Sequence, residues 1–165
     1  MSEDINAMMD INSIDLSTVE TDFPLLASGP CGLQIQECEF KTNDKSGKPF
    51  LHVKFATTQT TPHGGNPVKT VNPGDRGSTL NKDIYYGKYE DAKTGELKPY
   101  GVDEIAKLRE AVFGKAAPGT RFDPAEMLGQ NLVGNLRFDP EPKNKKTGEV
   151  FGPRTEVASY IRKAR

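Results

Sequence analysis

The chain has 165 residues, of which 35% are hydrophobic, and it contains two cysteines. This length suits one domain with a tail, and the low hydrophobic content predicts that part of the chain is unstructured. Two cysteines are too few for a disulfide-rich scaffold, and no segment is typical of a signal peptide or a membrane span. We therefore expect a protein without membrane contacts in a reducing, cytoplasmic setting.

Charge is distributed unevenly along the chain. Residues 1–30 contain six acidic residues and no Lys or Arg, whereas the rest carries 22 basic and 17 of the 23 acidic side chains, a net charge of +5. We therefore expect an acidic, flexible arm and linker over residues 1–29 and a folded domain over residues 30–165. Three roles for the arm stay open: competition with nucleic acid for the basic body, recruitment of a basic partner, or a solubilising tail.

The first two predicted strands form a hairpin. Residues 31–40 alternate between apolar and polar side chains, but the alternation slips, which predicts a β-bulge near Glu37. Residues 43–49 have the composition of a hairpin turn. The second strand, over residues 50–58, has a core-facing apolar set, and its opposite face carries Phe50, His52 and Lys54.

Two connections surround the third predicted strand, which covers residues 79–86. Residues 60–78 show no periodicity and are rich in Pro and Gly, which predicts a long loop of the kind that often has a function. Residues 87–101 form a second irregular connection in this prediction and are rich in Lys and Tyr.

Two helices and two strands complete the prediction. An apolar stripe predicts a helix over residues 102–115, and Asp123 followed by proline predicts the capped start of a short second helix. A fourth strand is expected over residues 131–138, a basic turn over 140–148, and a fifth strand over 151–161 with Val157 and Ile161 facing inward.

This order of elements predicts a mainly β fold with one or two helices. Five strands with a helix between the third and fourth are typical of the OB fold, a small barrel that binds oligonucleotides. We therefore expect a five-stranded OB-fold-like barrel over residues 30–165. Several architectures share this order, so the order by itself does not select one.

The chain also resembles the single-stranded DNA-binding proteins of tailed bacteriophages, a group with the OB fold. The similar segments are residues 32–41, 46–55, 122–129 and 145–148, and the resemblance extends over about residues 30–162. It implies a cytoplasmic role in phage DNA replication, recombination or repair, with single-stranded DNA as partner. Many members carry an acidic C-terminal tail, whereas this chain ends in Arg-Lys-Ala-Arg and is acidic at its N-terminus. The arm is therefore a candidate contact for replication or recombination proteins.

Aromatic and basic side chains are the candidate binding residues, because single-strand binders stack bases on aromatic rings and contact phosphates with cations. Phe50 on the outer face of its strand either stacks on a base or packs under a neighbouring loop, and the two interpretations stay open. Four tyrosines lie among lysines in and after the third strand. The predicted single-stranded DNA-binding residues are Lys41, Phe50, His52, Lys54, Lys82, Tyr85, Tyr86, Lys88, Arg154 and Tyr160.

Other functions are weaker candidates. The spacing of Cys31 and Cys38 matches no common zinc motif, even with His52 and His63 added, and the chain has no phosphate-binding loop or nucleophile elbow. We therefore expect that the protein is not an enzyme and that it binds no cofactor and no metal. A nuclease is the least favoured alternative. The alternative is a structural or adaptor protein of a virion or replication complex that binds protein rather than DNA. Self-association and the choice between DNA and RNA stay open.

Overall fold

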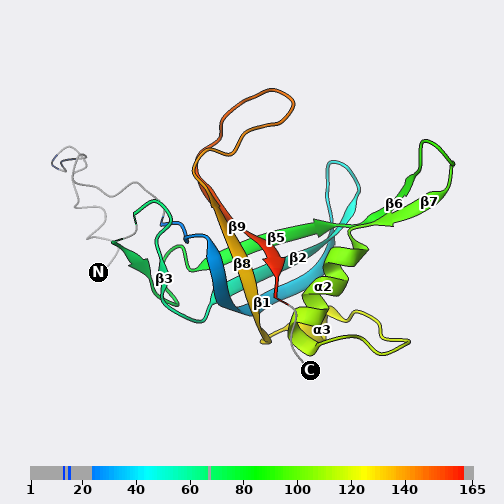
Figure 1. Ribbon diagram of the computed structural model, residues 1–165, viewed down its shortest axis with the longest axis horizontal. Coiled ribbons are helices and arrows are strands. Elements are labelled where there is room, and N and C mark those ends of the chain that lie inside the picture. The colour runs from blue at the N-terminus through cyan, green and yellow to red at the C-terminus, as the bar shows by residue number, and fades with distance from the viewer. Residues whose placement is uncertain (1–12, 14, 16–23, 67, 162–165) are drawn as a thin grey trace.

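A five-stranded antiparallel sheet forms the centre of the protein (Figure 1). The computed structural model describes residues 13, 15, 24–66 and 68–161, so the expected acidic arm lies almost wholly outside the described residues. The order of strands in the sheet is β5-β2-β1-β8-β9. These strands are β1 (Gly29–Thr42), β2 (Pro49–Thr57), β5 (Thr79–Tyr85), β8 (Asn131–Asp139) and β9 (Arg154–Tyr160). The fold is therefore mainly β, as predicted.

Two small hairpins and two helices occupy the connections between the strands of the sheet. The hairpins pair β3 (Thr61–Pro62) with β4 (Thr70–Val71) and β6 (Gly87–Glu90) with β7 (Leu97–Tyr100). The helices are α2 (Val102–Phe113) and α3 (Pro124–Met127). The Asp123 side chain accepts a hydrogen bond from the Ala125 N–H at 3.0 Å, which confirms the predicted helix cap. None of the described helices is long and apolar enough to cross a membrane.

The first strand, β1, bends and pairs with two neighbouring strands. Its N-terminal part, residues 29–34, pairs with β8, and its C-terminal part pairs with β2. The register with β2 shifts between Ile35 and Glu37, which confirms the predicted bulge. The extra residue changes the phase of the strand, so Cys38 faces the core on the same side as Leu33 and Ile35.

The sheet is not closed into a barrel by strand pairing, and here the structure corrects the prediction. β5 and β9 are the two edges of the sheet, and no backbone ladder joins them among the described residues. A side chain bridges this gap instead, because the Lys82 ammonium on β5 donates a hydrogen bond to the Val157 carbonyl on β9.

The placement of the helix also differs from the prediction. Counted over the described strands, α2 follows the seventh strand rather than the third. The reason is that residues 60–78 and 87–101, both expected as irregular connections, each contain a hairpin. Each hairpin is held by backbone hydrogen bonds between its two strands. Such pairing does not require alternating hydrophobic side chains, so the sequence pattern did not indicate these strands.

The core lies between the inner face of the sheet and the helices. On β2 the residues Leu51, Val53 and Phe55 are fully buried. α2 packs against β8 and β9, and α3 packs against β1. Leu26 is also fully buried and forms a bridge with His63, so residues 24–28 pack on the fold rather than crossing to it as a free linker.

The residues of β9 that face the core also differ from those predicted. Val157 is buried, as expected, but Ile161 is exposed and Tyr160 packs on the core. The register with β8 pairs Leu136 with Val157 and Asn135 with Ser159, which leaves Ala158 as a bulge. This bulge reverses the alternation beyond Val157 and turns the Tyr160 side chain inward.

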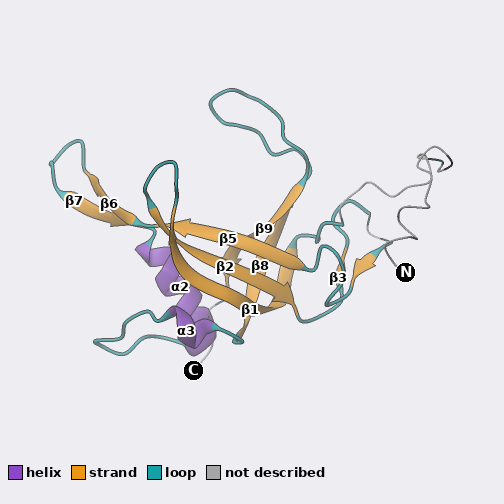
Figure 2. Cartoon of the chain, turned by 180° about the vertical axis from the view of Figure 1, so that it is seen from behind, coloured by secondary structure: helices purple, strands orange, loops and turns teal. Residues whose placement is uncertain are grey.

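Three connections project from the same side of the sheet (Figure 2). They are the turn between β1 and β2, the β6–β7 hairpin and the basic loop between β8 and β9. In both views the β1–β2 turn and the β6–β7 hairpin lie next to each other at one end of the sheet (Figures 1 and 2). This end of the sheet therefore brings together two segments that are distant in sequence, residues 43–48 and residues 85–100.

Candidate nucleic-acid interface

The aromatic row, consisting of Lys41, Phe50 and Tyr85, crosses the outer face of β1, β2 and β5. The strand register places Phe50 opposite Lys41 on one side and opposite Tyr85 on the other. The two ring centroids are 5.0 Å apart with an interplanar angle of 34°. Tyr85 is 37% exposed and Phe50 is partly exposed. The pair therefore presents aromatic surface to solvent on the face opposite the core.

A pocket of about 520 Å³, the tyrosine pocket, lies next to this row. Its lining residues are Asn43, Ser46, Lys48, Tyr85, Tyr89 and Tyr100. The rings of Tyr89 and Tyr100 are neighbours on one face of the β6–β7 hairpin, with centroids 6.5 Å apart and an interplanar angle of 54°. Because Tyr85 belongs to both the row and the pocket, the aromatic surface continues from the sheet onto the hairpin.

Local hydrogen bonds hold the pocket together. The Asn43 carbonyl oxygen Oδ1 accepts from the N–H groups of Lys45 and Ser46 at 2.8 and 3.1 Å, which fixes the β1–β2 turn. The Asn43 amide Nδ2 then donates to the Tyr85 hydroxyl at 2.9 Å. On the hairpin, the Tyr100 ring lies directly over Gly87, where a Cβ would be 3.0 Å from the Tyr100 hydroxyl oxygen.

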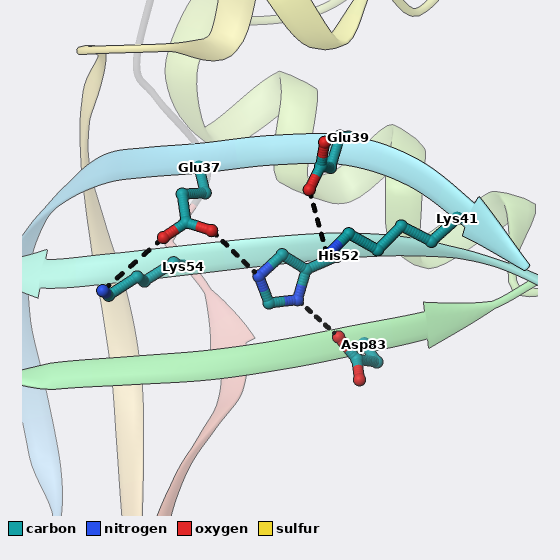
Figure 3. Close-up of polar contacts among 6 residues, drawn as sticks. All are labelled: Glu37, Glu39, Lys41, His52, Lys54 and Asp83. Atoms are coloured by element: carbon teal, nitrogen blue, oxygen red, sulfur yellow. Dashed lines mark hydrogen bonds and ion pairs between the residues drawn. The ribbon is translucent and has the colours of Figure 1, made fainter. Parts of the chain in front are cut away.

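Carboxylates share the outer face with the basic side chains (Figure 3). His52 Nδ1 donates to Asp83 Oδ1 at 2.8 Å, and His52 Nε2 lies 3.5 Å from Glu37 Oε1. The other carboxylate oxygen of Glu37 lies 3.5 Å from Lys54 Nζ. Two of the expected binding residues, His52 and Lys54, are therefore already paired with acidic side chains.

Lys41 is paired in the same way. Its ammonium lies 3.0 Å from Glu39 Oε1. The hydrogen bond to Glu39, together with the negative charge of that carboxylate, raises the pKa of Lys41 above its ordinary value. Lys41 therefore stays charged, but the nearby carboxylate offsets its positive charge, and this weakens its attraction for a phosphate.

The expected binding residues separate into two groups of five. Lys41, Phe50, His52, Lys54 and Tyr85 lie together on the outer face of β1, β2 and β5. Lys82, Tyr86, Lys88, Arg154 and Tyr160 lie elsewhere.

Lys82 and Tyr160 belong to the inner side of the fold. Lys82 alternates with outward-facing Asp83 on β5, and its ammonium lies 3.8 Å from Glu104 and 5.8 Å from the centre of the Tyr160 ring. Tyr160 packs against Phe55, with ring centroids 6.3 Å apart. Burial, followed by the nearby charge of Glu104, raises the pKa of Tyr160 above its ordinary range.

The other three residues also lie outside the group on β1, β2 and β5. Tyr86 packs on the core, with its ring edge-on to Phe40 at 5.7 Å. Lys88 is opposite Pro99 in the hairpin register, which places it on the hairpin face that does not carry Tyr89. Arg154 begins β9 and pairs with β8.

Replacing Lys82 by Met should lower the free energy of unfolding by about 1.5–3 kcal/mol, the range for hydrogen bonds made by charged groups. The methionine keeps the apolar stem near Tyr160 but removes the donor that joins β5 to β9. Urea denaturation measures the change. The matched control is Lys54→Met on the outer face, which loses only the exposed pair with Glu37 and should cost no more than about 1 kcal/mol. An equal loss of stability in both variants would contradict an internal role for Lys82.

Sequence reasoning missed Asn43, Ser46 and Lys48 as pocket residues and did not place Tyr89 and Tyr100 in the site. The tyrosine cluster itself was a usable signal. The missing information was the hairpin register, which puts Tyr89, Lys98 and Tyr100 on one face. Lys98 is paired with Asp91 at 2.9 Å, and this hydrogen bond lowers the pKa of the Asp91 carboxyl.

The two cysteines of the weak zinc candidate lie on the opposite side of the sheet from one of its two histidines, His52. Cys31 and Cys38 are buried in the core, and burial raises the pKa of the Cys38 thiol to about 11. His52 lies on the outer face among carboxylates. Among the described residues, no three His, Cys, Asp or Glu side chains are grouped so that they could hold a metal ion.

No family model matches the chain, and no curated protein matches it. The function must therefore be inferred from the arrangement of its own residues.

Proposed function

We propose that this protein binds single-stranded DNA with little dependence on base sequence. It coats or protects transient single strands during phage DNA replication, recombination or repair in the host cytoplasm. In this proposal the open five-stranded sheet binds the strand on its outer face, as an OB fold does, without closing into a barrel. Binding requires no cofactor, and the protein catalyses no reaction.

The aromatic surface that runs from Phe50 and Tyr85 to Tyr89 and Tyr100 is the observation that carries this proposal. Base stacking on an aromatic side chain contributes about 1–3 kcal/mol per base, and every base offers a ring face. A surface with several partly exposed rings in succession therefore suits an unpaired strand. A duplex offers no free base faces and would gain little from the same rings.

The fold supports the proposal in a second way. OB folds bind oligonucleotides on the face of the second and third strands and with the loops next to it. In this chain the corresponding surface is the outer face of β2 and β5, next to the β1–β2 turn. The aromatic row and the tyrosine pocket occupy this surface.

The electrostatic contribution to binding should be modest. Three lysines, Lys41, Lys48 and Lys54, lie on or beside the aromatic surface, and two of them are paired with Glu39 or Glu37. For about two or three phosphate contacts, the slope of log affinity against log salt is about −1.4 to −2 for a single strand. Stacking therefore supplies most of the binding free energy in this proposal.

A protein-binding role is the second candidate. The carboxylates of Glu37, Glu39 and Asp83 on the outer face favour it, because they would repel a phosphate backbone. In this case the protein would be a structural or adaptor component of a phage particle or replication complex. The exposed tyrosines would then be anchors in a protein interface.

Fluorescence anisotropy with a labelled oligo-dT of about 30 nucleotides, long enough for one OB-fold site, separates the two candidates. The proposal predicts saturable binding that weakens as salt rises and that excess duplex DNA does not compete away. An absence of binding at low salt would reject it in favour of the protein-binding role. Gel filtration with and without the oligonucleotide is an independent check on the same complex.

The acidic arm is proposed to regulate access of DNA or to contact a replication or recombination protein. Its six acidic residues lie in a segment without Lys or Arg, so it can compete with DNA for basic side chains. Deletion of residues 1–22 should then raise the affinity for oligo-dT. Unchanged affinity would reject competition and leave recruitment of a partner.

A further inference from the structure

The β6–β7 hairpin is a two-stranded ribbon that projects from one end of the main sheet (Figure 1). Within the part of the chain that the structure describes, β7 is the one strand that pairs with β6. Each strand of the ribbon therefore has a second edge, whose backbone groups face away from its partner. Lys88, Tyr89 and Glu90 on β6 are all exposed to solvent. The ribbon is therefore a candidate for pairing with a further strand.

Pro99 determines which backbone groups of the ribbon point outward. It lies opposite Lys88 and has no N–H group, so these two residues form a pair without hydrogen bonds between them. The Asp91 N–H donates to the Glu96 carbonyl at 2.8 Å, which fits the same alternation. The N–H and C=O groups of Lys88 and Glu90 therefore point away from β7, and we call them the β6 edge.

The outer edge of β7 is less suited to pairing. Its outward positions are Leu97 and Pro99, which lie opposite Glu90 and Lys88 in the register. Pro99 cannot donate a hydrogen bond, and proline on a free strand is one of the features that prevent the addition of another strand. Both outward residues of β6, in contrast, have an N–H group. The ribbon is therefore blocked on one edge and open on the other.

We infer that the β6 edge pairs with the β6 edge of a second copy of this chain, in antiparallel orientation about a two-fold axis at Tyr89. In this register Lys88 of each copy lies opposite Glu90 of the other copy. Each of these two pairs exchanges both backbone hydrogen bonds and brings opposite charges together on the same face. The same surface is used on both copies, as a two-fold interface requires.

Charge selects this register over its neighbours. A shift of two residues in one direction places Lys88 opposite Lys88 of the other copy, and a shift in the other direction places Glu90 opposite Glu90. Like charges directly opposite each other are destabilising, so both shifted registers are disfavoured. A lysine alone on a free edge would oppose strand addition. The glutamate two residues later makes the edge complementary to itself.

The contact is short, because β6 covers only Gly87–Glu90. Small interfaces are typical of weak and transient complexes, so we expect a monomer–dimer equilibrium rather than a permanent dimer. Residues that lie opposite each other in a ladder share a face of the sheet. The two Tyr89 rings therefore lie side by side in the dimer, and the aromatic surfaces of both copies meet there.

Sedimentation velocity of the full chain without DNA, up to millimolar concentration, tests this inference. The wild-type chain should show a monomer–dimer equilibrium. Lys88→Glu alone or Glu90→Lys alone makes both cross-strand pairs repulsive, so each variant should weaken the dimer by about 5- to 100-fold. An equimolar mixture of the two variants restores opposite charges and should form a heterodimer. The double variant K88E/E90K should self-associate as the wild-type chain does.

Lys93→Glu is the matched control, because it makes the same change of charge on the same hairpin but outside β6. It should leave the dimer unchanged, and circular dichroism verifies the fold of each variant. A wild-type chain that stays monomeric, a dimer that the single variants leave unchanged, or a mixture without heterodimer would overturn the inference. Because no DNA is present, these results do not depend on whether the chain binds single strands.

Discussion

Replacing Phe50 by Ala should weaken binding of single-stranded DNA by about 5- to 150-fold, which corresponds to the loss of one stacked base at about 1–3 kcal/mol. Phe50 lies at the centre of the aromatic row, 5.0 Å from the Tyr85 ring, and is only partly buried. The variant should therefore fold while losing a stacking platform. Anisotropy with oligo-dT measures the affinity, and circular dichroism verifies the fold.

Phe113→Ala is the matched control. Phe113 is also a partly exposed aromatic residue, 39% exposed at the end of α2, and the guanidinium of Arg109 lies 5.0 Å from its ring centre. It therefore presents an exposed aromatic ring next to a cation, but on a helix outside the aromatic row. We expect its affinity for oligo-dT to equal that of the wild-type chain. Equal losses of affinity in the two variants would contradict the assignment of the aromatic row as a DNA-binding surface.

Replacing Gly101 by Ala should lower the free energy of unfolding by about 2–4 kcal/mol, through a strained backbone and an overpacked contact. Gly101 has φ 76°, and a Cβ there would be 2.0 Å from the Tyr85 carbonyl oxygen and 2.9 Å from the Tyr86 Cα. These atoms form the base of the β6–β7 hairpin, so the substitution should also displace the tyrosine pocket. Urea denaturation measures the stability, and anisotropy measures the accompanying loss of affinity.

Gly119→Ala measures how much of this loss of stability comes from backbone strain alone. Gly119 has a similar φ of 84°, but a Cβ there would meet no atom within 4 Å. Its substitution should cost only about 1–2 kcal/mol, the cost of a left-handed backbone at a residue with a side chain. The difference between the two variants is the cost of the contact with Tyr85 and Tyr86. No difference would show that the backbone at Gly101 relaxes freely.

Features that depend on local sequence were predictable. The alternation of β2 placed Phe50, His52 and Lys54 on the outer face, and the slipped alternation of β1 revealed the bulge near Glu37. Asp123 before a proline indicated the start of α3. In each case the physical cause, the burial of alternate side chains or a capping hydrogen bond, acts within a few residues.

Features that depend on distant partners were not predictable. The bulge at Ala158 leaves no mark in the sequence, because Ala fits either face, so the inward turn of Tyr160 came as a correction. The bridge from Lys82 to Val157 joins strands at opposite edges of the sheet. For these reasons the structure places Lys82 and Tyr160 on the inner side of the fold, apart from the expected residues on the outer face of β1, β2 and β5.

The carboxylates on the outer face change the expected mode of binding. Lysine-rich composition alone suggests a cationic groove, but Lys41 and Lys54 lie next to Glu39 and Glu37. Cross-strand pairs of opposite charge also stabilise the sheet, by about 0.2–1 kcal/mol each. We therefore expect a binding site that depends on aromatic stacking more than on charge, and one that tolerates physiological salt better than a purely cationic groove.

The most direct test of where DNA binds is an amide nitrogen–hydrogen correlation spectrum of the full chain, recorded during titration with oligo-dT. We expect the largest shift changes in residues 39–54 and 83–100, which contain the aromatic row and the tyrosine pocket. Amides of α2 and of β9 should change little. Changes centred on α2 or β9, or no changes at saturating oligonucleotide, would contradict the assignment of the outer face of β1, β2 and β5 as the DNA-binding surface.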